Sequence, residues 1–359
     1  MKLRLALVGY GGVNQALVDL LGEKRTNLAT HGIEVAVTVV ADAKFGVVMN
    51  PEGIDPAQLV EMAANGCDVA ALATSARVDF MPNADTDDVL RAIASPCVDV
   101  LVEATFTNPH GGEPALSHCR TALQHGKHVI TVNKGPIAFA YNGLQRDAKR
   151  AGVLLKCEGT VMSGTPVLRQ ITTTLRGCEV TAFEGILNGT SNFVLGLVEQ
   201  GYGFHDAVKE AQRMGYAEAD PSADIEGHDV RLKTAILAHA LWSAGVTPAQ
   251  IACRGITGLT EQVIRDARKD GLAWRLIGSA TRHEDGSVRA TVEPRMLPLG
   301  HPLLAASGVT NAIAFDTDLL GRVTVSGPGA GRRETAFAIL SDLIELGEEL
   351  RIRTKAVAA

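Results

Sequence analysis

The N-terminal part of the chain alternates short runs rich in Val, Ile and Leu with longer stretches that have helical spacing. Such alternation is typical of βαβ units, in which crossover helices join parallel strands. The expected strands are Leu3–Val8, Val35–Ala41, Val98–Ala104, His128–Val132 and Val153–Cys157. The expected helices are Val13–Leu21, Asp87–Ala94, Pro114–His125 and Leu144–Ala151. The pattern predicts an α/β fold whose first domain is doubly wound around a parallel sheet.

After Glu158 the pattern changes to longer strand-like runs followed by a group of helices. The expected strands are Gln170–Arg176, Glu179–Leu187 and Arg322–Ser326. The expected helices are Ser191–Glu199, Phe204–Met214, Gly227–Ala244 and, after a glycine-rich turn, Arg333–Glu349. We therefore expect one domain over residues 1–155, completed by the C-terminal residues 327–359, and an α+β substrate domain over residues 156–326.

The composition of the chain indicates which classes of molecule the protein is expected to bind. The 359 residues carry a formal net charge of −6, and Lys and Arg are spread along the chain, so nothing favours nucleic acid. No stretch approaches the roughly 18 uninterrupted apolar residues that span a bilayer, so we expect no membrane contact and a cytoplasmic location. The six cysteines are far apart, which predicts reduced thiols and no zinc site. A small-molecule substrate is the expectation that follows.

A glycine-rich turn follows the first expected strand directly and precedes an amphipathic helix. Its residues are Gly9, Gly11, Gly12, Val13 and Asn14, with Tyr10 between the first two glycines. At such a turn the pyrophosphate of a dinucleotide meets the N–H groups of the helix N-terminus. Asn14 stands where the usual fingerprint has its third glycine, so a strand-to-helix turn without a ligand is the competing interpretation. The turn favours a dinucleotide-binding domain over residues 1–155.

The end of the second expected strand bears on the choice of dinucleotide. Asp42 stands where an acidic side chain can accept a hydrogen bond from the adenosine ribose. Lys44 lies two residues further on, where it would instead meet a 2′-phosphate. NAD and NADP therefore both stay open as the cofactor.

The segment 215–233 carries the strongest sign of acid/base chemistry. Asp229 and Lys233 are four residues apart at the start of an expected helix, so their head groups share one face. An exposed ion pair of little consequence is the ordinary interpretation of such a spacing. However, an almost wholly apolar stretch, Thr234–Leu241, follows at once. We therefore expect Lys233 to point into a sheltered cleft, which suits a proton-transferring lysine.

At this segment the chain resembles the homoserine dehydrogenase family, whose signature has the same Gly-Tyr-Ala-Glu, Asp-Pro, Asp-Ile, Gly, Asp and Lys at these spacings. The resemblance extends over nearly the whole chain. It includes Val132-Asn133-Lys134, Glu158-Gly159-Thr160-Val161, the run from Gly185 to Phe193, and the terminal Gly-Pro-Gly-Ala-Gly. It implies interconversion of L-homoserine and L-aspartate 4-semialdehyde with NAD or NADP, in threonine and methionine biosynthesis. It also implies a homodimer that forms through the α+β domain, around residues 300–330.

The resemblance implies roles for particular residues. Hydride transfer needs no protein nucleophile, but it needs a group that handles the hydroxyl proton. Lys233 is the implied acid/base, oriented by Asp229, which also lies at the substrate. Lys134 is implied beside the nicotinamide as a second catalytic cation. Glu218, with the backbone near Gly215, is implied as the site for the substrate ammonium; its alternative is a solvated loop acid.

Further residues are implied to contact the cofactor or an ion. Thr105 follows the strand Val98–Ala104, although the bulky Phe106 beside it departs from the family pattern. Gly329 and Gly331 are implied to let the returning chain approach the nicotinamide, or else simply form a tight turn. An alkali cation, Na⁺ or K⁺, is implied in a loop with carbonyl ligands, at Glu158, Val161, Ser163 and Thr165.

Two other functions stay open at this point. The first is another nicotinamide-dependent amino-acid or sugar dehydrogenase, against which Glu218, Asp229 and Lys233 argue together. The second is a non-catalytic dinucleotide-binding sensor, which would have no use for two lysines in its cleft. Formation of reduced cofactor with L-homoserine would separate the enzyme from the sensor.

Overall fold

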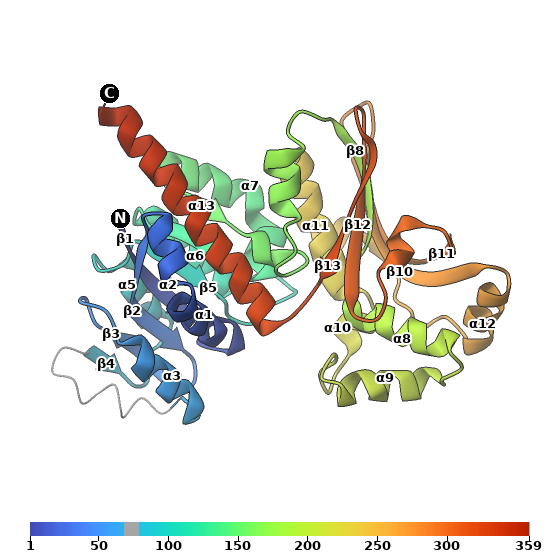
Figure 1. The fold of residues 1–359 in the computed structure, drawn as a ribbon, viewed down its shortest axis with the longest axis horizontal. Coiled ribbons are helices and arrows are strands. Elements are labelled where there is room, and N and C mark those ends of the chain that lie inside the picture. Colours follow the sequence, from blue (N-terminus) through green and yellow to red (C-terminus); the bar gives the residue numbers. More distant parts are fainter. Residues whose placement is uncertain (68–78, 359) are drawn as a thin grey trace. The chain divides into compact units, whose positions relative to one another are not determined.

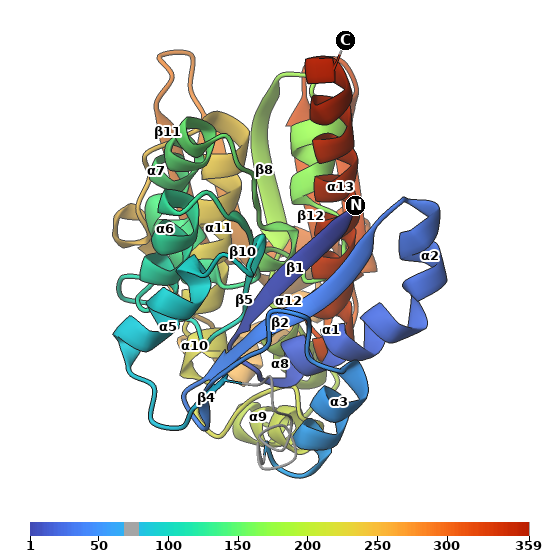
Figure 2. The same ribbon diagram turned by 90° about the vertical axis from the view of Figure 1, so that its left-hand side faces the viewer.

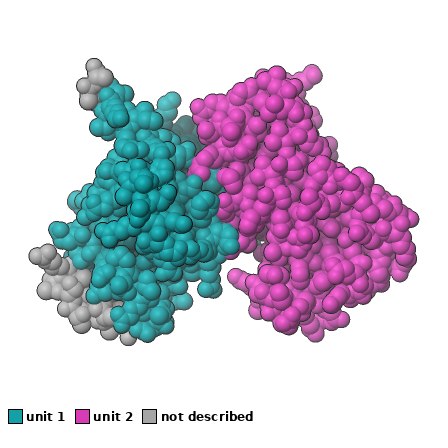
Figure 3. Space-filling model, viewed as in Figure 1, with its two compact units in different colours: residues 1–160, 332–359 teal, residues 161–331 magenta. Residues whose placement is uncertain are grey.

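The structure is a computed structural model that describes residues 1–67 and 79–358. The chain forms two compact units, shown in different colours in Figure 3. Unit 1 comprises residues 1–160 and 332–359, and unit 2 comprises residues 161–331. The chain therefore returns to unit 1 at Arg332, five residues after the start of the expected C-terminal segment.

Unit 1 contains a seven-stranded sheet in the order β4-β3-β2-β1-β5-β6-β7. The strands are β1 Lys2–Val8, β2 Glu34–Asp42, β3 Gly46–Met49, β4 Asp79–Met81, β5 Val100–Glu103, β6 His128–Thr131 and β7 Leu155–Lys156. The five neighbouring strands β2, β1, β5, β6 and β7 are parallel, whereas β3 and β4 add an antiparallel edge. The predicted α/β class with a parallel sheet is confirmed. The strand order reverses at β1, and the carboxyl ends of strands at such a point are where these sheets bind ligands.

The helices of unit 1 are α1 Gly12–Glu23, α2 Arg25–Thr30, α3 Pro56–Ala64, α5 Thr86–Ala94, α6 Ala115–Gln124, α7 Lys134–Ala151 and α13 Arg332–Ala358, with a 3₁₀ turn, η1, at Glu158–Thr160. The C-terminal helix α13 lies alongside α1 in both ribbon views (Figures 1 and 2). Ile339, Leu340 and Leu343 of α13 are buried in the same apolar cluster as Leu5 and Leu7 of β1. This burial holds the C-terminal helix in unit 1, although it follows unit 2 in the sequence.

Unit 2 contains a six-stranded sheet in the order β13-β12-β8-β10-β11-β9. Its strands are β8 Val180–Ile186, β9 Ala252–Cys253, β10 Leu272–Arg282, β11 Val288–Pro298, β12 Thr310–Thr317 and β13 Gly321–Pro328. Its helices are α8 Gly189–Glu199, α9 Phe204–Arg213, α10 Ser222–Ile225, α11 His228–Trp242 and α12 Glu261–Lys269, with shorter turns η2 Gln170–Thr174, η3 Pro248–Gln250 and η4 Pro302–Ala305. All neighbouring strands except β9 and β11 are antiparallel.

The strand expected at Gln170–Arg176 is wrong, because this segment is helical and includes the π-helical turn η2. Its β-branched Ile and Thr residues favour a strand locally. However, Ile171 and Leu175 are four residues apart and both are buried, which fits one face of a helix. The Thr172 hydroxyl also donates to the Leu168 carbonyl at 2.8 Å. Tertiary burial and this side-chain bond outweigh the strand propensity.

Close packing of α11 on the sheet depends on a glycine in β10. A Cβ atom at Gly278 would lie 2.4 Å from the Thr234 hydroxyl oxygen and 2.7 Å from Val230 Cγ1. Only glycine therefore lets α11 approach the sheet so closely. Since Lys233 is on this helix, the contact also fixes how far the backbone of Lys233 lies from the sheet.

Three general features of the described chain concern membranes, thiols and metals. Within residues 1–67 and 79–358, no helix is both long and apolar enough to cross a bilayer. All six cysteines are free thiols. In the same residues, no three His, Cys, Asp or Glu side chains gather as metal ligands.

Candidate active site

A pocket of about 390 Å³ lies at the carboxyl ends of the central strands of unit 1. It brings together four of the residues predicted to contact a dinucleotide, namely Gly9, Gly11, Asp42 and Thr105. Its lining also includes residues that the sequence did not indicate, among them Ala84, Asp85, Thr86, Phe106 and His118. Only the folded sheet brings these residues together, because they follow different strands.

The glycine-rich turn has the shape that a close ligand requires. Gly9 has a φ of 82°, and a Cβ atom there would lie 2.7 Å from the backbone of Ala104 and Thr105. A Cβ at Gly11 would meet nothing within 4 Å, so space is open there. The Asn14 side chain is buried and donates to the Gly9 carbonyl at 2.9 Å, so it stabilises the turn itself.

The start of α1 is also suited to an anion. The N-cap residue Gly11 has no side chain to cap the first N–H groups, and the first turn, where Gly12 and Val13 lie, holds no acidic residue. Uncapped N–H groups and the positive end of the helix dipole favour a phosphate. The open turn, its charge and the adjoining pocket together fit a dinucleotide.

Asp42 and Lys44 differ in their relation to the pocket. Asp42 is one of its lining residues, whereas Lys44 lines a separate hollow with Phe45 and Phe80. The Asp42 carboxylate accepts a hydrogen bond from the backbone N–H of Lys44 at 3.0 Å. This bond holds the carboxylate at the end of β2, on the side of the pocket.

A buried carboxylate that the sequence analysis did not single out supports Thr105. Glu103 is fully buried at the end of β5 and accepts from the Thr105 N–H at 3.2 Å and also from its hydroxyl. Asn133, the N-cap of α7, donates to the carbonyls of Thr105 and Phe106 at 3.1 and 2.9 Å. Lys134 follows as the first residue of α7. This network fixes the loop after β5, which forms one wall of the pocket.

In unit 2, the predicted pair of Asp229 and Lys233 lies at the start of α11. The Lys233 Nζ lies 2.8 Å from the Asp229 carboxylate and donates to the Leu187 carbonyl at 2.6 Å. Lys233 is only 7% exposed, so this is no surface ion pair. An ammonium group has three N–H donors. Two of them have protein partners here, which leaves the third for a substrate oxygen.

A second carboxylate adjoins this pair, and sequence reasoning missed it. The Asn188 amide donates to Asp224 at 2.6 Å and to Asp229 at 3.0 Å, so it holds the two acids on either side of itself. Burial raises the pKa of Asp224, and the negative charge of Asp229 raises it further. The cluster of Lys233, Asp229, Asn188 and Asp224, hereafter the lysine cluster, comes from three separate segments. The sequence signal available was the run of acids from Glu218 to Asp229, in which only these two residues are predicted site residues.

The predicted ammonium site lies on a loop between α9 and α10. Gly215 has a φ of 73° and begins this loop, and Glu218 is exposed on it. The Gln212 side chain donates to the Glu218 carbonyl at 3.1 Å. The Thr190 hydroxyl donates to the Tyr216 carbonyl at 2.7 Å, which ties the loop to the start of α8 near Asn188. No hydrogen bond within the described residues joins the Glu218 carboxylate to the lysine cluster.

The residues predicted for an alkali cation divide between the units. Glu158 belongs to unit 1, where its backbone N–H donates to Asp342 at 3.1 Å. Val161, Ser163 and Thr165 begin unit 2 and are buried. Ser163 has a φ of 52°, an uncommon conformation for a residue other than glycine. The alkali-cation site at these residues stays a prediction.

The terminal glycines lie where β13 ends. A Cβ atom at Gly329 would lie 2.1 Å from the Asn311 side chain, so close backbone packing inside unit 2 already requires glycine there. Gly331 has a φ of 133° and is the last residue before unit 1 resumes. Both positions are compatible with a tight turn, and the contact of Gly329 and Gly331 with the nicotinamide stays a prediction.

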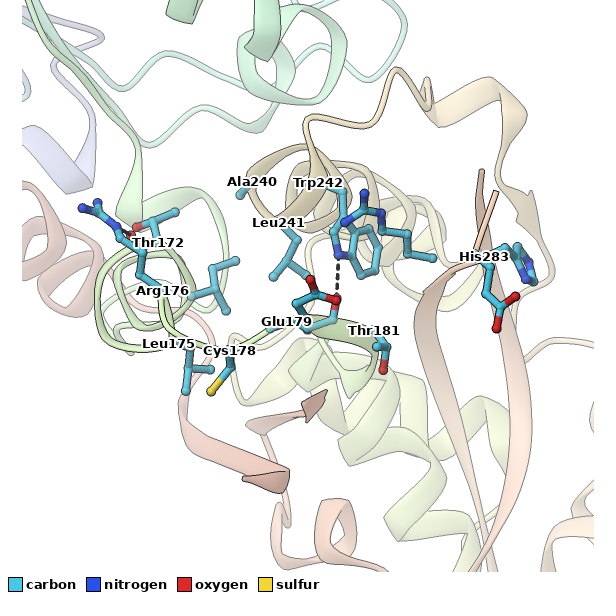
Figure 4. A pocket seen from close by; sticks show the side chains of 14 residues that line it. Thr172, Leu175, Arg176, Cys178, Glu179, Thr181, Ala240, Leu241, Trp242 and His283 are labelled. Carbon is cyan, nitrogen blue, oxygen red and sulfur yellow. Dashed lines mark hydrogen bonds between the residues drawn. The ribbon is translucent and has the colours of Figure 1, made fainter. Parts of the chain in front are cut away.

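A hollow of about 600 Å³ lies beside the last turn of α11 (Figure 4). The Trp242 ring forms part of its wall, and its Nε1 donates to the Val180 carbonyl at 2.8 Å. The charged residues around it, Arg176, Glu179, Arg282 and Glu284, are exposed and of both signs. None of the predicted site residues lines this hollow, although it is larger than the dinucleotide pocket.

Two family models match the chain and together cover most of it. A model described as homoserine dehydrogenase, NAD binding domain, matches residues 9–158. A model described as homoserine dehydrogenase matches residues 166–344. The first match contains the glycine-rich turn, and the second contains the lysine cluster.

Known proteins resemble the chain over nearly its full length. A protein of Pseudomonas canavaninivorans named NAD(+)-dependent homoserine dehydrogenase is 50% identical, over 96% of each chain. A solved structure from Archaeoglobus fulgidus has a TM-score of 0.84 and 35% identity, covering 96% of this chain and 99% of the other. A hyperthermophilic archaeal homoserine dehydrogenase in complex with NADPH has a TM-score of 0.80 and 27% identity, covering 96% and 98%.

Proposed function

Because the chain belongs to the homoserine dehydrogenase family, we propose that it interconverts L-homoserine and L-aspartate 4-semialdehyde as an NAD(P)-dependent oxidoreductase. This reaction serves the biosynthesis of threonine and methionine. The observation that carries the proposal is the buried lysine cluster, in which Lys233 keeps one N–H donor for a substrate oxygen. Bound dinucleotide supplies the hydride acceptor for oxidation and the hydride donor for reduction.

Lys233 handles the hydroxyl proton. In the neutral form its amine accepts the proton from homoserine as the alcohol is oxidised, and in the charged form it donates to the semialdehyde carbonyl during reduction. Asp229 and the Leu187 carbonyl hold Nζ from two directions, so the remaining direction is the one in which a proton is transferred. Asp229 therefore orients the base and also borders the substrate. Lys134 is proposed as a second catalytic cation on family likeness.

The substrate ammonium needs an anionic partner, which we assign to Glu218. Its exposed carboxylate is on the loop that Gly215 begins and that Thr190 ties to the segment around Asn188. A charged ammonium loses hydration when it enters a cleft, so a carboxylate there improves binding without any part in hydride transfer.

The preferred dinucleotide is NAD in this proposal. Asp42 lines the pocket and its carboxylate suits a ribose hydroxyl, whereas a 2′-phosphate would meet a like charge. The relative from Pseudomonas canavaninivorans carries NAD(+)-dependent in its name, which supports the same choice. Gly9, Gly11, Gly12, Val13, Asn14 and Thr105 would hold the rest of the dinucleotide, and Lys44, Gly329 and Gly331 stay predicted contacts.

Three further features are proposed from the family likeness. An alkali cation, Na⁺ or K⁺, binds at Glu158, Val161, Ser163 and Thr165 in a structural role. Two copies form a homodimer through residues 156–326, a proposal supported by β13, which is an edge strand of its sheet within the described residues. The protein acts in the cytoplasm. Light scattering with and without K⁺ would test the dimer and the cation together.

One spectrophotometric assay tests the activity. Absorbance of the reduced nicotinamide is followed with L-homoserine and either NAD or NADP, and L-serine and L-threonine serve as control alcohols. We expect turnover with homoserine and a kcat/KM at least about tenfold higher with NAD. Equal turnover with the control alcohols would favour another dehydrogenase, and dinucleotide binding without turnover would favour a sensor.

A further inference from the structure

The first residue of α13 lies directly over the glycine-rich turn. A Cβ atom at Gly12 would lie 2.5 Å from Cδ and 2.6 Å from Nε of Arg332. The middle of the arginine side chain therefore occupies the volume that any other residue at position 12 would need. Both residues belong to unit 1, where α13 packs along α1. The contact places the Nε end of the guanidinium at Gly12, in the first turn of α1.

The guanidinium of Arg332 is available to a ligand. Arg332 is exposed, and in the described part of the chain no carboxylate or carbonyl accepts a hydrogen bond from it. Its neighbour Arg333 differs, since it forms an ion pair with Glu23 at the end of α1, with a hydrogen bond of 3.0 Å. Of two successive arginines, Arg333 is thus paired with a carboxylate, whereas the guanidinium of Arg332 has no acceptor among residues 1–67 and 79–358.

The surroundings of Arg332 select the kind of ligand. The guanidinium lies beside uncapped helix N–H groups in a turn without acidic residues, so positive potential from two sources converges there. The open space at Gly11 belongs to the dinucleotide pocket. Arginine presents a planar fork of donors that matches two phosphate oxygens. We propose that Arg332 binds the pyrophosphate of the dinucleotide from the side of α13, next to the helix N–H groups.

The proposal rests on the proposed function only in requiring that unit 1 binds a dinucleotide. It assigns a cofactor contact to the residue at which the chain re-enters unit 1, far in the sequence from the glycine-rich turn. Arg332 makes the same contact before and after hydride transfer. It should therefore strengthen dinucleotide binding without changing the rate of the chemical step at saturation.

The test measures binding of ADP-ribose, which has the pyrophosphate but no nicotinamide, by isothermal titration calorimetry with the full-length protein. For Arg332→Ala we expect the Kd to rise by about tenfold or more, the scale of a lost charge-assisted pair. Arg332→Lys keeps the positive charge but not the planar fork of donors, so its Kd for ADP-ribose should lie between those of the parent and Arg332→Ala. Arg333→Ala is the matched control and should stay within about twofold of the parent. Raising the salt concentration should weaken ADP-ribose binding by the parent more than binding by Arg332→Ala.

The possible results separate this inference from the proposed function. If Arg332→Ala binds ADP-ribose within twofold of the parent, or if Arg333→Ala loses as much affinity, the inference is wrong even when homoserine is oxidised. If the parent binds ADP-ribose but does not oxidise homoserine, only the proposed activity fails. In steady state, Arg332→Ala should raise KM for NAD and leave KM for homoserine and kcat near the parent values. A loss confined to kcat would also contradict the contact.

Discussion

The two ends of α11 differ in the way they hold polar groups. At its start, Lys233 and Asp229 are withdrawn from water and hydrogen-bonded to each other and to neighbouring segments. At its end, the larger hollow beside Trp242 is lined by charged side chains that remain in solvent. A buried charge is costly unless it is paired, whereas an exposed charge needs no partner. Convergence of buried polar groups, rather than cavity volume, is therefore the basis on which we propose the start of α11 as the reactive end.

The sharpest test of this comparison removes the amine at the start of the helix. Lys233→Ala should lower kcat with homoserine by at least about 10²-fold, because general acid/base catalysis contributes on that scale. Steady-state rates at saturating NAD and homoserine measure the effect. The variant also leaves the Asp229 carboxylate without its cation, so NADH binding is measured in parallel to show that the fold persists.

The matched control for Lys233 is Lys209→Ala. Lys209 is an exposed lysine on α9 in the same unit and should keep near-parent turnover. Near-parent turnover of Lys233→Ala itself would mean that the lysine cluster is only structural. The two ends of α11 would then not differ in function.

The second test concerns substrate binding near the reactive end. Glu218→Ala should raise KM for homoserine by about tenfold and change kcat little, since it removes an ammonium partner outside the hydride path. Asp220→Ala, on the same exposed loop, is the control and should leave KM unchanged. An unaltered KM in Glu218→Ala would assign the ammonium to another acid, with Asp224 next to be tested.

The third test uses the pKa of Asp224, which burial and the charge of Asp229 raise above its value in the unfolded chain. When the pKa of a carboxyl group is higher in the folded chain than in the unfolded chain, protonation of the group stabilises the fold. This contribution to the free energy of unfolding is complete below the unfolded pKa and is lost as the pH rises through the folded pKa. The charged form therefore destabilises the protein at neutral pH. Asp224→Asn, whose amide oxygen still accepts from Asn188, should raise the Tm at pH 7 by roughly a few degrees.

Thermal unfolding from pH 7 downward measures this effect. The gain in Asp224→Asn should shrink as the pH falls toward the unfolded pKa of the carboxyl, because the parent then becomes neutral too. Asp220 is exposed and accepts from the Ser222 backbone, which lowers its pKa, so Asp220→Asn should show no gain. A gain that is equal at every pH would assign the effect to packing instead of charge.

The smallest effect is expected at the other end of α11. Arg282→Ala removes an exposed cation from the wall of the hollow and should leave kcat and KM within about twofold of the parent. The same steady-state assay measures it. A tenfold loss of activity would show that the larger hollow takes part in the reaction and would overturn the comparison.

Local pattern predicted unit 1 well and the sheet of unit 2 poorly. Strands β1, β2, β5 and β6 overlap the expected runs because each is a short apolar stretch bounded by turns. The long strands β10, β11 and β12 were not predicted. β10 contains Gly278, Ser279 and Ala280 in its middle, and β11 contains Pro294, so neither has the composition of a strand. Gly278 is explained by α11, which packs directly on it.

The sequence by itself determined the features that depend on near neighbours. The glycines that shape the turn after β1 act through their own backbone. Asp229 and Lys233 meet because four residues make about one helical turn. A local spacing is sufficient for such contacts, and no knowledge of the rest of the fold is required.

Only the tertiary structure decided which distant groups complete these arrangements. Asn188 is 41 residues from Asp229, and the Leu187 carbonyl that accepts from Lys233 is 46 residues away. Arg332 lies over Gly12 because apolar residues of α13 are buried in the core of unit 1. Burial of apolar surface brings these segments together wherever they occur in the chain, and spacing along the sequence carries no record of it.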